Sequence, residues 1–525
     1  MGKNQFCIFL GVVMQTNQAF SKPLLLVAVV SVFSTSAYAE DSDAVLRIKA
    51  LEAKMQLMQA QRAEQDKQLE LLTKELVGIE NQLSQSKIIK TEEKGSPVYA
   101  TFKDGISLED GAGNWKLAIN GRLQVDYRHF SPDVDAADTF SVRRARLGGT
   151  LTFYQDYVAK VEGEYSAATG TTLTYGYIDL NKFSAAKVRL GQFKPFYGLE
   201  RTMSTNFTDF QERSMGDALL GSTFDRGVMV FGSPTGGFNY SAAYVNGTGT
   251  ADENNAESDG KDLTARLTLN FSELMSWQNS VVHIGGFYAD GNQGSRRVAG
   301  VIPTGTTDAR GLAFFQTNCG TTAAGAATPA ATAACGGLLN NGFGGDVNRR
   351  RAGLETAVAY GPVKLQGEYI RLKFDNSRFN REITDWYASA MWNVTGESFS
   401  DMYKEGVFGR LKPKSNYKEG SSNWGALQVG VRYDQFDGSD FKATNAAGTG
   451  ILLNAPVSTT DGLLIATNQA DSWTLGANWI LNPNVRLVTN LIRTSYDTPV
   501  TVRVNGQNQT LNHENTVTMR AQFDF

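Results

Sequence analysis

The sequence predicts an all-β transmembrane barrel of about 16 antiparallel strands, preceded by an N-terminal α-helical coiled coil. Three observations lead to this fold class: an alternating C-terminal strand, period-2 segments from Lys116 onward, and a heptad seam within 44–86. No stretch after residue 40 reaches the ~20 apolar residues that a membrane helix needs. The net charge of −3 over 525 residues argues against a nucleic-acid partner.

The last ten residues form a strand with two different faces. The apolar face carries Val517, Met519, Ala521, Phe523 and Phe525. The polar face carries Thr518, Arg520, Gln522 and Asp524. A soluble core would have to bury Arg520 or Asp524, whereas a barrel strand faces lipid outside and water inside. The alternative is an edge strand of a soluble sandwich. A free aromatic C-terminus also resembles the assembly signal of bacterial outer-membrane proteins.

The N-terminus reads as a secretory signal peptide over residues 1–39. Lys22 precedes an apolar run at 24–30, and Ala37-Tyr38-Ala39 is a small-x-small cleavage site that places the mature start near Glu40. A second, weaker apolar run at 6–14 leaves the initiation site open. Export would remove Cys7 with the signal. The remaining pair, Cys319 and Cys335, is most simply one disulfide in an oxidising compartment.

Residues 40–92 are predicted to form a periplasmic coiled coil. Its seam, with spacings of four and three, is Ala44, Ile48, Leu51, Met55, Met58, Arg62, Gln65, Leu69, Leu72, Leu76, Ile79 and Leu83. Arg62 and Gln65 interrupt the seam, which can fix register or oligomer number. The helix would extend on the order of 60 Å, and Gly95-Ser96-Pro97 ends the segment. The alternative is a helix folded back on a globular partner.

Residues 98–525 are assigned to the barrel. From Lys116 the hydrophobic period becomes 2, and about sixteen segments of barrel-strand length follow. They lie near 117–127, 141–153, 157–167, 173–180, 186–193, 226–232, 238–246, 262–271, 281–290, 349–360, 363–374, 384–395, 425–436, 472–481, 485–496 and 515–525. Tight connections alternate with long Gly/Ala/Thr/Asn-rich ones, as turns alternate with loops in such barrels. The connection 396–424 is long where a short turn is due.

Alternation places cationic and anionic side chains on the inner wall. Arg122, Arg144 and Lys160 face inward, as do the acids Asp126, Glu162, Glu164 and Glu368. Strict alternation would turn the side chain of Arg143 away from the lumen, so Arg143 is expected at the end of its strand. The cluster Arg122, Arg143 and Arg144 suits phosphate or carboxylate, because guanidinium groups bind these anions by paired hydrogen bonds. The alternative is that these charges only keep the lumen wet.

The connection 194–225 follows the fifth strand and is long, aromatic and charged. In sixteen-stranded membrane channels a loop at this place commonly folds inward and narrows the pore. An enzyme is disfavoured, because His129, His283 and His513 are scattered without metal spacing, and neither a phosphate-binding glycine loop nor a nucleophile motif is present. No cofactor is predicted.

A set of ordered motifs resembles the phosphate-selective porin O and P family over roughly residues 98–525. The motifs are 120–127 (NGRLQVDY), 142–147 (VRRARL), 191–200 (GQFKPFYGLE), Gly361-Pro362, 367–369 (GEY), 395–397 (TGE), Lys412-Pro413 and 474–479 (TLGANW). The long connection 396–424 also resembles that of the family. The resemblance implies trimeric sixteen-stranded outer-membrane channels that pass anions along rows of basic side chains.

The resemblance also assigns roles to individual residues. Arg122, Arg143, Arg144 and Arg213 stand where phosphate-specific members have arginine, and Arg201 stands where they have a lysine of the central anion site. Asn206 and Val158 stand where those members have further lysines, and Thr174 where one has an acid. The resemblance therefore implies anion passage with weak phosphate binding.

The function predicted from the sequence is an outer-membrane porin for passive uptake of small anions such as phosphate. The predicted partners are small anionic solutes, outer-membrane lipid and two further copies of the chain in a homotrimer. One alternative is a general diffusion porin. Another is an envelope tether whose periplasmic coiled coil binds peptidoglycan and whose barrel is mainly an anchor.

Overall fold

The computed structural model describes the chain in segments. They are 53–56, 58, 61, 64–68, 70, 71, 74, 88–89, 97–102, 105–133, 138–167, 170–250, 260–293, 303–315, 347–375, 380–441, 463–465, 467–504 and 507–525. The chain divides into two compact units, Met1–Ser86 and Lys87–Phe525. The predicted signal peptide and the cysteines Cys319 and Cys335 lie outside the described residues.

In the first unit, the described residues between 53 and 74 are helical. Glu70 and Lys74 form an ion pair of 3.0 Å one turn apart. Met55 and Met58, which belong to the predicted seam, are 54% and 52% exposed in the single chain. These two seam residues are therefore largely open to solvent in the single chain. No helix of the described residues is long and apolar enough to span a membrane.

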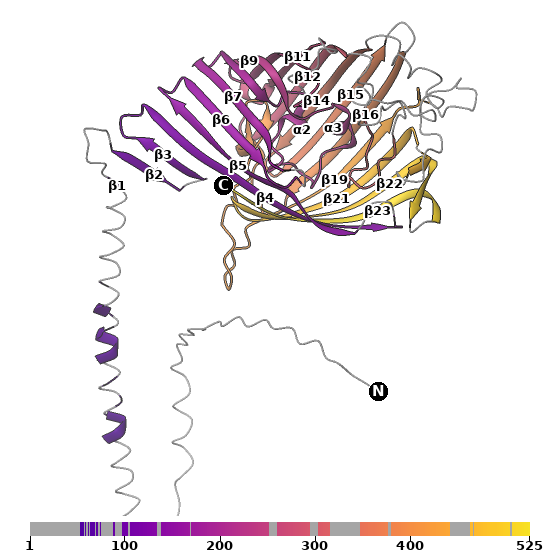
Figure 1. Cartoon of the computed structure of the whole chain (residues 1–525). Helices are drawn as coiled ribbons and strands as arrows, with labels where there is room; N and C mark the ends of the chain where they lie inside the picture. Colours follow the sequence, from indigo (N-terminus) through magenta and orange to yellow (C-terminus); the bar gives the residue numbers. More distant parts are fainter. Residues whose placement is uncertain are drawn as a thin grey trace, which may run out of the picture. The chain divides into compact units, whose positions relative to one another are not determined.

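In the second unit, sixteen described strands pair antiparallel, each with its neighbour along the chain, and the last pairs with the first (Figure 1). They are β4 (Trp115–Ser131), β5 (Thr139–Phe153), β6 (Tyr157–Glu164), β7 (Thr172–Phe183), β8 (Ala186–Phe193), β9 (Asp225–Thr235), β10 (Phe238–Val245), β11 (Asp262–Asn270), β12 (Ser280–Gln293), β14 (Val347–Tyr360), β15 (Val363–Asp375), β16 (Asn380–Asn393), β19 (Ala426–Asp437), β21 (Gln469–Asn482), β22 (Val485–Val504) and β23 (Gln507–Asp524). The predicted closed barrel of sixteen strands is confirmed, and every predicted strand segment overlaps one of these.

Short elements accompany the ring. They are β1 (Ile88–Ile89), β2 (Val98–Thr101), β3 (Ile106–Asp110), α2 (Leu199–Thr202), α3 (Met215–Leu219), α4 (Phe271–Leu274), η2 (Ser400–Met402), β17 (Tyr403–Lys404), β18 (Val407–Phe408) and β20 (Leu463–Ile465). The pair β2–β3 attaches to the start of β4, where Ile106 is opposite Ile119. This edge of β4 is free for β3 because β23 pairs only from Arg122 onward.

The alternating pattern sorts side chains between the two faces of the ring. On β23, Met519 and Phe523 are about half exposed on the outer face, whereas Arg520 and Gln522 are buried on the inner face. Arg520 is paired inside with Asp126 of β4, at 2.7 Å from its Nε to a carboxylate oxygen. The predicted two-faced terminal strand is confirmed, and closure of the ring supplies its charged face with a partner.

The connections differ between the two ends of the barrel. One end, here called the short-turn end, carries tight turns such as 154–156, 236–237 and 361–362. The connection 394–425 lies at this end as well, because Phe399 donates from its backbone N–H to the carbonyl of Gly361. The connection that is long in the sequence is therefore a long turn at this end, and the predicted number of about sixteen strands is unaffected.

Three connecting segments fold inward and fill much of the ring. The segment 194–224 carries α2 and α3, which Figure 1 shows amid the strands of the ring. The segment 303–315 packs Phe314 and Phe315 against Phe436 of β19, with ring centroids 5.1 Å apart in both cases. The segment 397–414 enters from the short-turn end. The buried apolar core therefore lies inside the ring, where these segments meet the wall.

Candidate functional site

The inward segment 194–224 is folded around a buried lysine. Lys194 directly follows β8, and its Nζ donates to the carbonyls of Arg201, Thr202 and Met203 at 2.7–2.9 Å. These carbonyls belong to α2 and its C-terminal end, where helical carbonyls lack partners within the helix. Burial, followed by the charges of Arg213 and Arg201, holds the pKa of Lys194 well below its usual value. Lys194 therefore shapes the loop and is not available to a solute.

Carboxylates of the wall hold the helix starts of this loop. Glu368 of β15 accepts hydrogen bonds from the backbone N–H groups of Leu199 at 3.0 Å and Glu200 at 2.6 Å. Asp434 of β19 accepts one from Met215 at 2.7 Å. The first N–H groups of a helix have no partner within it, so these acids satisfy donors that burial would leave unpaired.

On the opposite side of the loop, Glu212 draws several arginines together. Its Oε1 lies 2.8 Å from Nε of Arg143 and 2.9 Å from Nη2 of Arg520. Arg128 and Arg144 lie 3.4 and 3.8 Å from its oxygens. Burial opposes the charge, but Arg143, Arg144 and Arg520 outweigh it and hold the pKa of Glu212 well below its usual value. Glu212 thus joins the loop to β4, β5 and β23.

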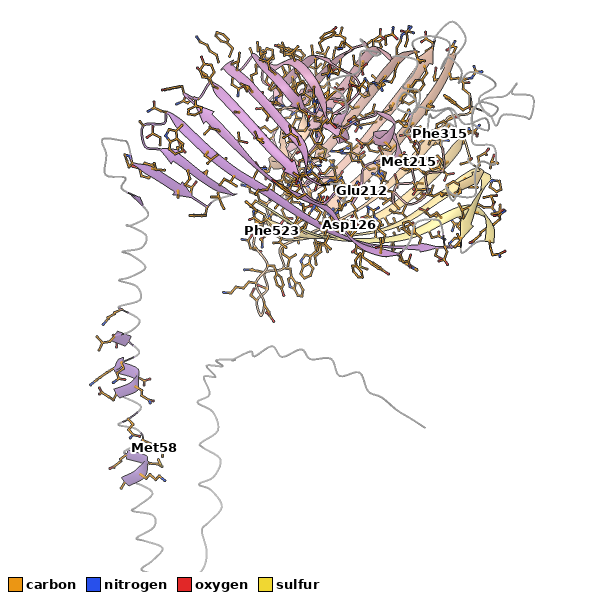
Figure 2. The ribbon with its side chains drawn as sticks, viewed as in Figure 1. Met58, Asp126, Glu212, Met215, Phe315 and Phe523 are labelled. Carbon is orange, nitrogen blue, oxygen red and sulfur yellow. The ribbon has the colours of Figure 1, made fainter. Side chains whose placement is uncertain are left out.

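A cavity of about 270 Å³ lies where this loop meets the wall. Its charged lining is Arg128, Arg143, Arg144, Arg201, Arg213, Arg310, Glu212 and Asp217. Six guanidinium groups thus face two carboxylates. Figure 2 labels Glu212 and Met215 of the loop inside the ring of strands, with Asp126 on the wall. Low-dielectric walls focus the electric field of these charges, so the excess of cationic groups attracts anions.

The second acid of the cavity, Asp217, serves three arginines. Its carboxylate lies 3.4 Å from Arg201, 3.5 Å from Arg213 and 3.6 Å from Arg310. Burial would raise the pKa of Asp217, but Arg213, Arg201 and Arg310 outweigh burial and lower it to about 2. Within the described residues, the buried Nε donors of four lining arginines still have no hydrogen-bond partner: Arg128, Arg201, Arg213 and Arg310.

The structure brings four of the five predicted arginines into this cavity. Arg122 is the exception: its Nη1 donates to Thr205 Oγ1 at 2.7 Å, and it does not line the cavity. Arg201 is held by backbone carbonyls, because its terminal nitrogens donate to the carbonyls of Asp217 at 2.5 Å and Gly221 at 2.6 Å. Arg213 donates from Nη2 to the carbonyl of Met203 at 2.9 Å. Arg201 and Arg213 therefore also tie the loop together.

The predicted place of Arg143 at a strand end is wrong. Arg143 lies within β5, at a bulge where the register with β4 shifts: Gln124 is opposite Arg144, but Val125 is opposite Val142. The extra residue in a bulge escapes the alternation of the strand. Arg143 and Arg144 can therefore both turn to the lumen, and the side chain of Arg143 remains 35% exposed.

Sequence reasoning missed Arg128 and Arg310. Arg128 continues the inward alternation of Arg122, Gln124 and Asp126, one step beyond the strand end assigned at 127, so the pattern already contained it. Arg310 lies in the inward segment 303–315, and its neighbourhood carries no periodicity that points to the lumen.

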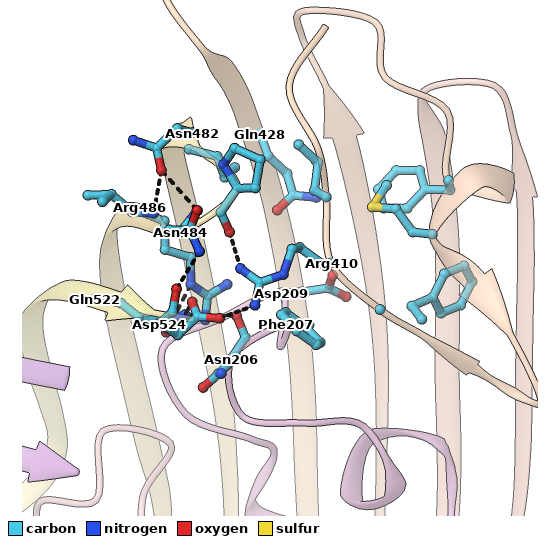
Figure 3. Close-up of a pocket in the computed structure, with 18 of the residues that line it drawn as sticks. Asn206, Phe207, Asp209, Arg410, Gln428, Asn482, Asn484, Arg486, Gln522 and Asp524 are labelled. Carbon is cyan, nitrogen blue, oxygen red and sulfur yellow. Dashed lines mark hydrogen bonds and ion pairs between the residues drawn. The ribbon is translucent and has the colours of Figure 1, made fainter. Parts of the chain in front are cut away.

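The residues that depart from the family pattern lie outside the arginine cavity. Asn206 lines a smaller pocket of about 40 Å³ on the other side of the loop (Figure 3). There Arg410 pairs with Asp524, joined by a dashed line in Figure 3. Thr174 donates its hydroxyl to the carbonyl of Glu162 at 2.9 Å. Val158 is part of β6, opposite Asp179 of β7.

No group of three or more His, Cys, Asp or Glu side chains among the described residues is arranged to hold a metal ion.

A family model and a relative with a known name both point to one family. The family model of phosphate-selective porin O and P matches residues 117–525. Porin O of Pseudomonas aeruginosa is 25% identical over 423 residues, which cover 77% of this chain and 88% of that protein. Among solved structures, the anion-selective porin from Comamonas acidovorans matches with 13% identity and a TM-score of 0.45, covering 78% of this chain and 100% of that chain. The outer membrane channel DcaP of Acinetobacter baumannii matches with 11% identity and a TM-score of 0.44, covering 79% and 99%.

Proposed function

This chain belongs to the phosphate-selective porin O and P family and is an outer-membrane porin, and we propose that its channel passes small anions, phosphate-like ones among them, by diffusion through the arginine cavity. The observation that carries this proposal is the excess of guanidinium groups over carboxylates in the cavity beside the inward loop. Guanidinium groups stay charged at all physiological pH values and supply hydrogen bonds that replace part of the water of an anion.

The contacts of the individual arginines support a moderate preference for anions. Arg143 and Arg310 retain 35% and 20% side-chain exposure, so they are the lining arginines most open to a passing ion. Arg201 and Arg213 are engaged with backbone carbonyls and Asp217. The unpaired Nε donors of the lining arginines are buried, so phosphate meets few accessible donors. We therefore expect weak binding without a high-affinity site.

The remaining acids of the lumen weaken the cationic field less than their number suggests. Glu162 and Glu164 both accept from Arg146, at 3.4 and 2.6 Å. Asp126 is paired with Arg520, and Glu368 accepts from the loop backbone. A neutralised pair contributes little long-range field, so the arginine cavity dominates the selectivity that we propose.

Reversal potentials in a planar bilayer test this function directly. With a tenfold gradient of potassium chloride, we expect the sign of an anion-preferring channel, and millimolar phosphate should reduce the chloride current reversibly. A channel that prefers potassium would reject the anion assignment and leave a general diffusion porin. A protein that inserts but never conducts would favour the tethering alternative.

We further propose that residues 40–92 form a periplasmic coiled coil that joins three copies of the porin. The exposed seam residues Met55 and Met58 support this, because apolar side chains in a heptad seam are normally covered by partner helices. In the same arrangement, residues 1–39 are the signal peptide and 98–525 the barrel in the outer membrane. The tethering alternative, with the helices bound to peptidoglycan, rests on the same exposed seam.

A further inference from the structure

A stripe of cations stacked on aromatic rings runs along the inner wall from β6 to β9. Lys160 Nζ lies 4.4 Å from the ring centroid of Tyr175, and Arg189 Cζ lies 3.8 Å from that of Tyr177. Lys187 Nζ lies 5.8 Å from the ring centroid of Phe231. All three distances are within the range of a cation–π interaction. The stripe therefore alternates positive charge with flat apolar surface.

This wall is the open side of the barrel. The side chains of Lys160 and Arg189 keep 21% and 12% exposure. Across the ring, inward residues such as Lys364, Asp385 and Arg432 are about 1% exposed, because the inward segments cover them. The wall from β6 to β9 is therefore less covered by the inward segments than the wall across the ring.

The stripe ends in a second cavity, of about 350 Å³, near the short-turn end. Its lining includes Lys187, Phe196, Phe231, Arg266, Thr268 and Lys404. The rings of Phe196 and Phe231 meet edge to face, with centroids 6.0 Å apart. None of these residues lines the arginine cavity, so this is a separate place in the channel.

The cations of the second cavity differ in their pairing with carboxylates. Arg266 is paired with Glu355 at 2.7 Å, and Lys404 lies 3.8 Å from Glu405. Among the described residues, no carboxylate lies within ion-pair distance of Lys187. A cavity with one free ammonium group, an aromatic wall and the Thr268 hydroxyl combines charge recognition with apolar contact.

We propose that this second cavity binds small aromatic carboxylates. The carboxylate would pair with Lys187, and the ring would stack on Phe231 beside Phe196. Inorganic phosphate has no apolar face and therefore makes no favourable contact with the phenylalanine rings. An aromatic solute can stack on them offset or edge-on. The inference goes beyond the anion function proposed above, since it names an organic solute class and a site of its own.

Benzoate is the probe, and cyclohexanecarboxylate is the control of equal charge and similar size without aromaticity. Chloride current through wild-type channels is recorded while each anion is added to both sides. We expect benzoate to block at a lower concentration than cyclohexanecarboxylate. Phe231→Leu and Lys187→Gln should each raise the half-blocking benzoate concentration about threefold or more, while leaving the phosphate block unchanged. Phe231→Tyr, which keeps the ring, should retain the block.

Matched controls separate this site from its surroundings. Lys182 and Phe183 form an exposed cation–aromatic pair that lines neither cavity, with Nζ 6.0 Å from the ring centroid. Lys182→Gln and Phe183→Leu should therefore leave the benzoate block unchanged. Arg143→Gln should weaken the phosphate block and spare the benzoate block, which distinguishes failure at the arginine cavity from failure here.

The same site can be tested without current. Ligand-detected NMR of benzoate with detergent-solubilised protein should show binding that Phe231→Leu weakens and Phe231→Tyr restores. Equal block by benzoate and cyclohexanecarboxylate, or benzoate binding that is indifferent to Phe231→Leu, would overturn the proposal.

Discussion

The carboxylate of Glu368, on the barrel wall, accepts a hydrogen bond of 2.6 Å from the backbone N–H of Glu200, on the inward loop. The adjacent Gly198 has φ +63°, and a Cβ at this position would collide with the Glu368 carboxylate. Glycine is thus required here both by its backbone angle and by the close approach of the acid. The wall and the loop are therefore fitted to each other at this point.

Replacing Glu368 with glutamine should loosen the inward loop. Glu368 accepts hydrogen bonds from two backbone N–H groups and from the hydroxyl of Tyr387 at 2.7 Å. A glutamine side chain has one amide oxygen in place of two carboxylate oxygens, so its NH2 group would face N–H or O–H donors. Leaving buried donors unpaired costs about 1–3 kcal/mol. We expect a lower unfolding temperature in detergent and noisier single-channel current. Glu382→Gln, which alters an exposed ion pair with Arg371, is the matched control and should change little. Equal unfolding temperatures and equal noise would contradict this role.

Removing the more exposed arginines of the cavity should shift selectivity toward cations. Two unit charges 4 Å apart in water interact by about 1 kcal/mol. Removing one guanidinium charge by Arg143→Gln or Arg310→Gln should therefore lower the anion-to-cation permeability ratio roughly two- to fivefold. Reversal potentials measure this ratio. Arg371→Gln removes the same charge from an exposed pair outside the cavity and should have no effect.

The double replacement of Arg201 and Arg213 with alanine should also move the reversal potential toward cation preference. Their backbone hydrogen bonds add a second consequence, because the carbonyls of Asp217, Gly221 and Met203 lose their partners. We therefore expect increased current noise in this variant, unlike Arg143→Gln. An unchanged reversal potential in both variants would reject the arginine cavity as the source of selectivity.

The acids of the loop should keep their charge in moderately acidic solution. The pKa of Asp217 is lowered from its usual value of 3.8 to about 2, after the charges of Arg213, Arg201 and Arg310 outweigh burial. A lowered folded-state pKa means that its stabilising contribution is complete above about pH 4 and is lost as the pH falls through about 2. The difference in reversal potential between wild type and Asp217→Asn should thus stay constant from pH 7 to pH 4. A difference that has already fallen by about half near pH 3.8, the usual pKa of an aspartate, would show that Asp217 titrates normally.

Deleting residues 42–90 should lower the thermal stability of a trimer and leave a conducting barrel. The physical reason is that the predicted coiled coil joins three barrels and contributes nothing to the pore itself. Semi-native electrophoresis against temperature, combined with bilayer conductance, measures both properties. A crosslinked dimer, or helices that remain separate in the full-length protein, would contradict the predicted homotrimer.

Cys319 and Cys335 should form one disulfide in protein taken from outer membranes. Closing so short a loop restricts the unfolded chain by about 3 kcal/mol in the chain-entropy model. We expect little effect of Cys319→Ser on the barrel, because the link closes only a local Gly/Ala/Thr-rich loop. Mass spectrometry of the intact protein decides the point, and two free thiols would refute it.

The sixteen strands and the faces of most of their residues followed from the sequence alone. The reason is local: a strand between lipid and a polar interior alternates with period 2, so Phe523 had to face outward and Arg520 inward. The same alternation extends to Arg128, which was missed only because its strand runs to Ser131. The inward course of the loop 194–224 was also predicted, although from its place after the fifth strand and not from its own pattern.

Only the tertiary structure decided which charges meet. Arg143 enters the lumen through a bulge, and a shift of register between two strands is invisible to a pattern read along one of them. Arg310 approaches Asp217 from a loop distant in sequence. Glu212 gathers its arginines because β4, β5 and β23 become neighbours when the ring closes. Alternation along each strand fixes the side that a residue faces, whereas its partner depends on chain closure and loop packing, which no local period encodes.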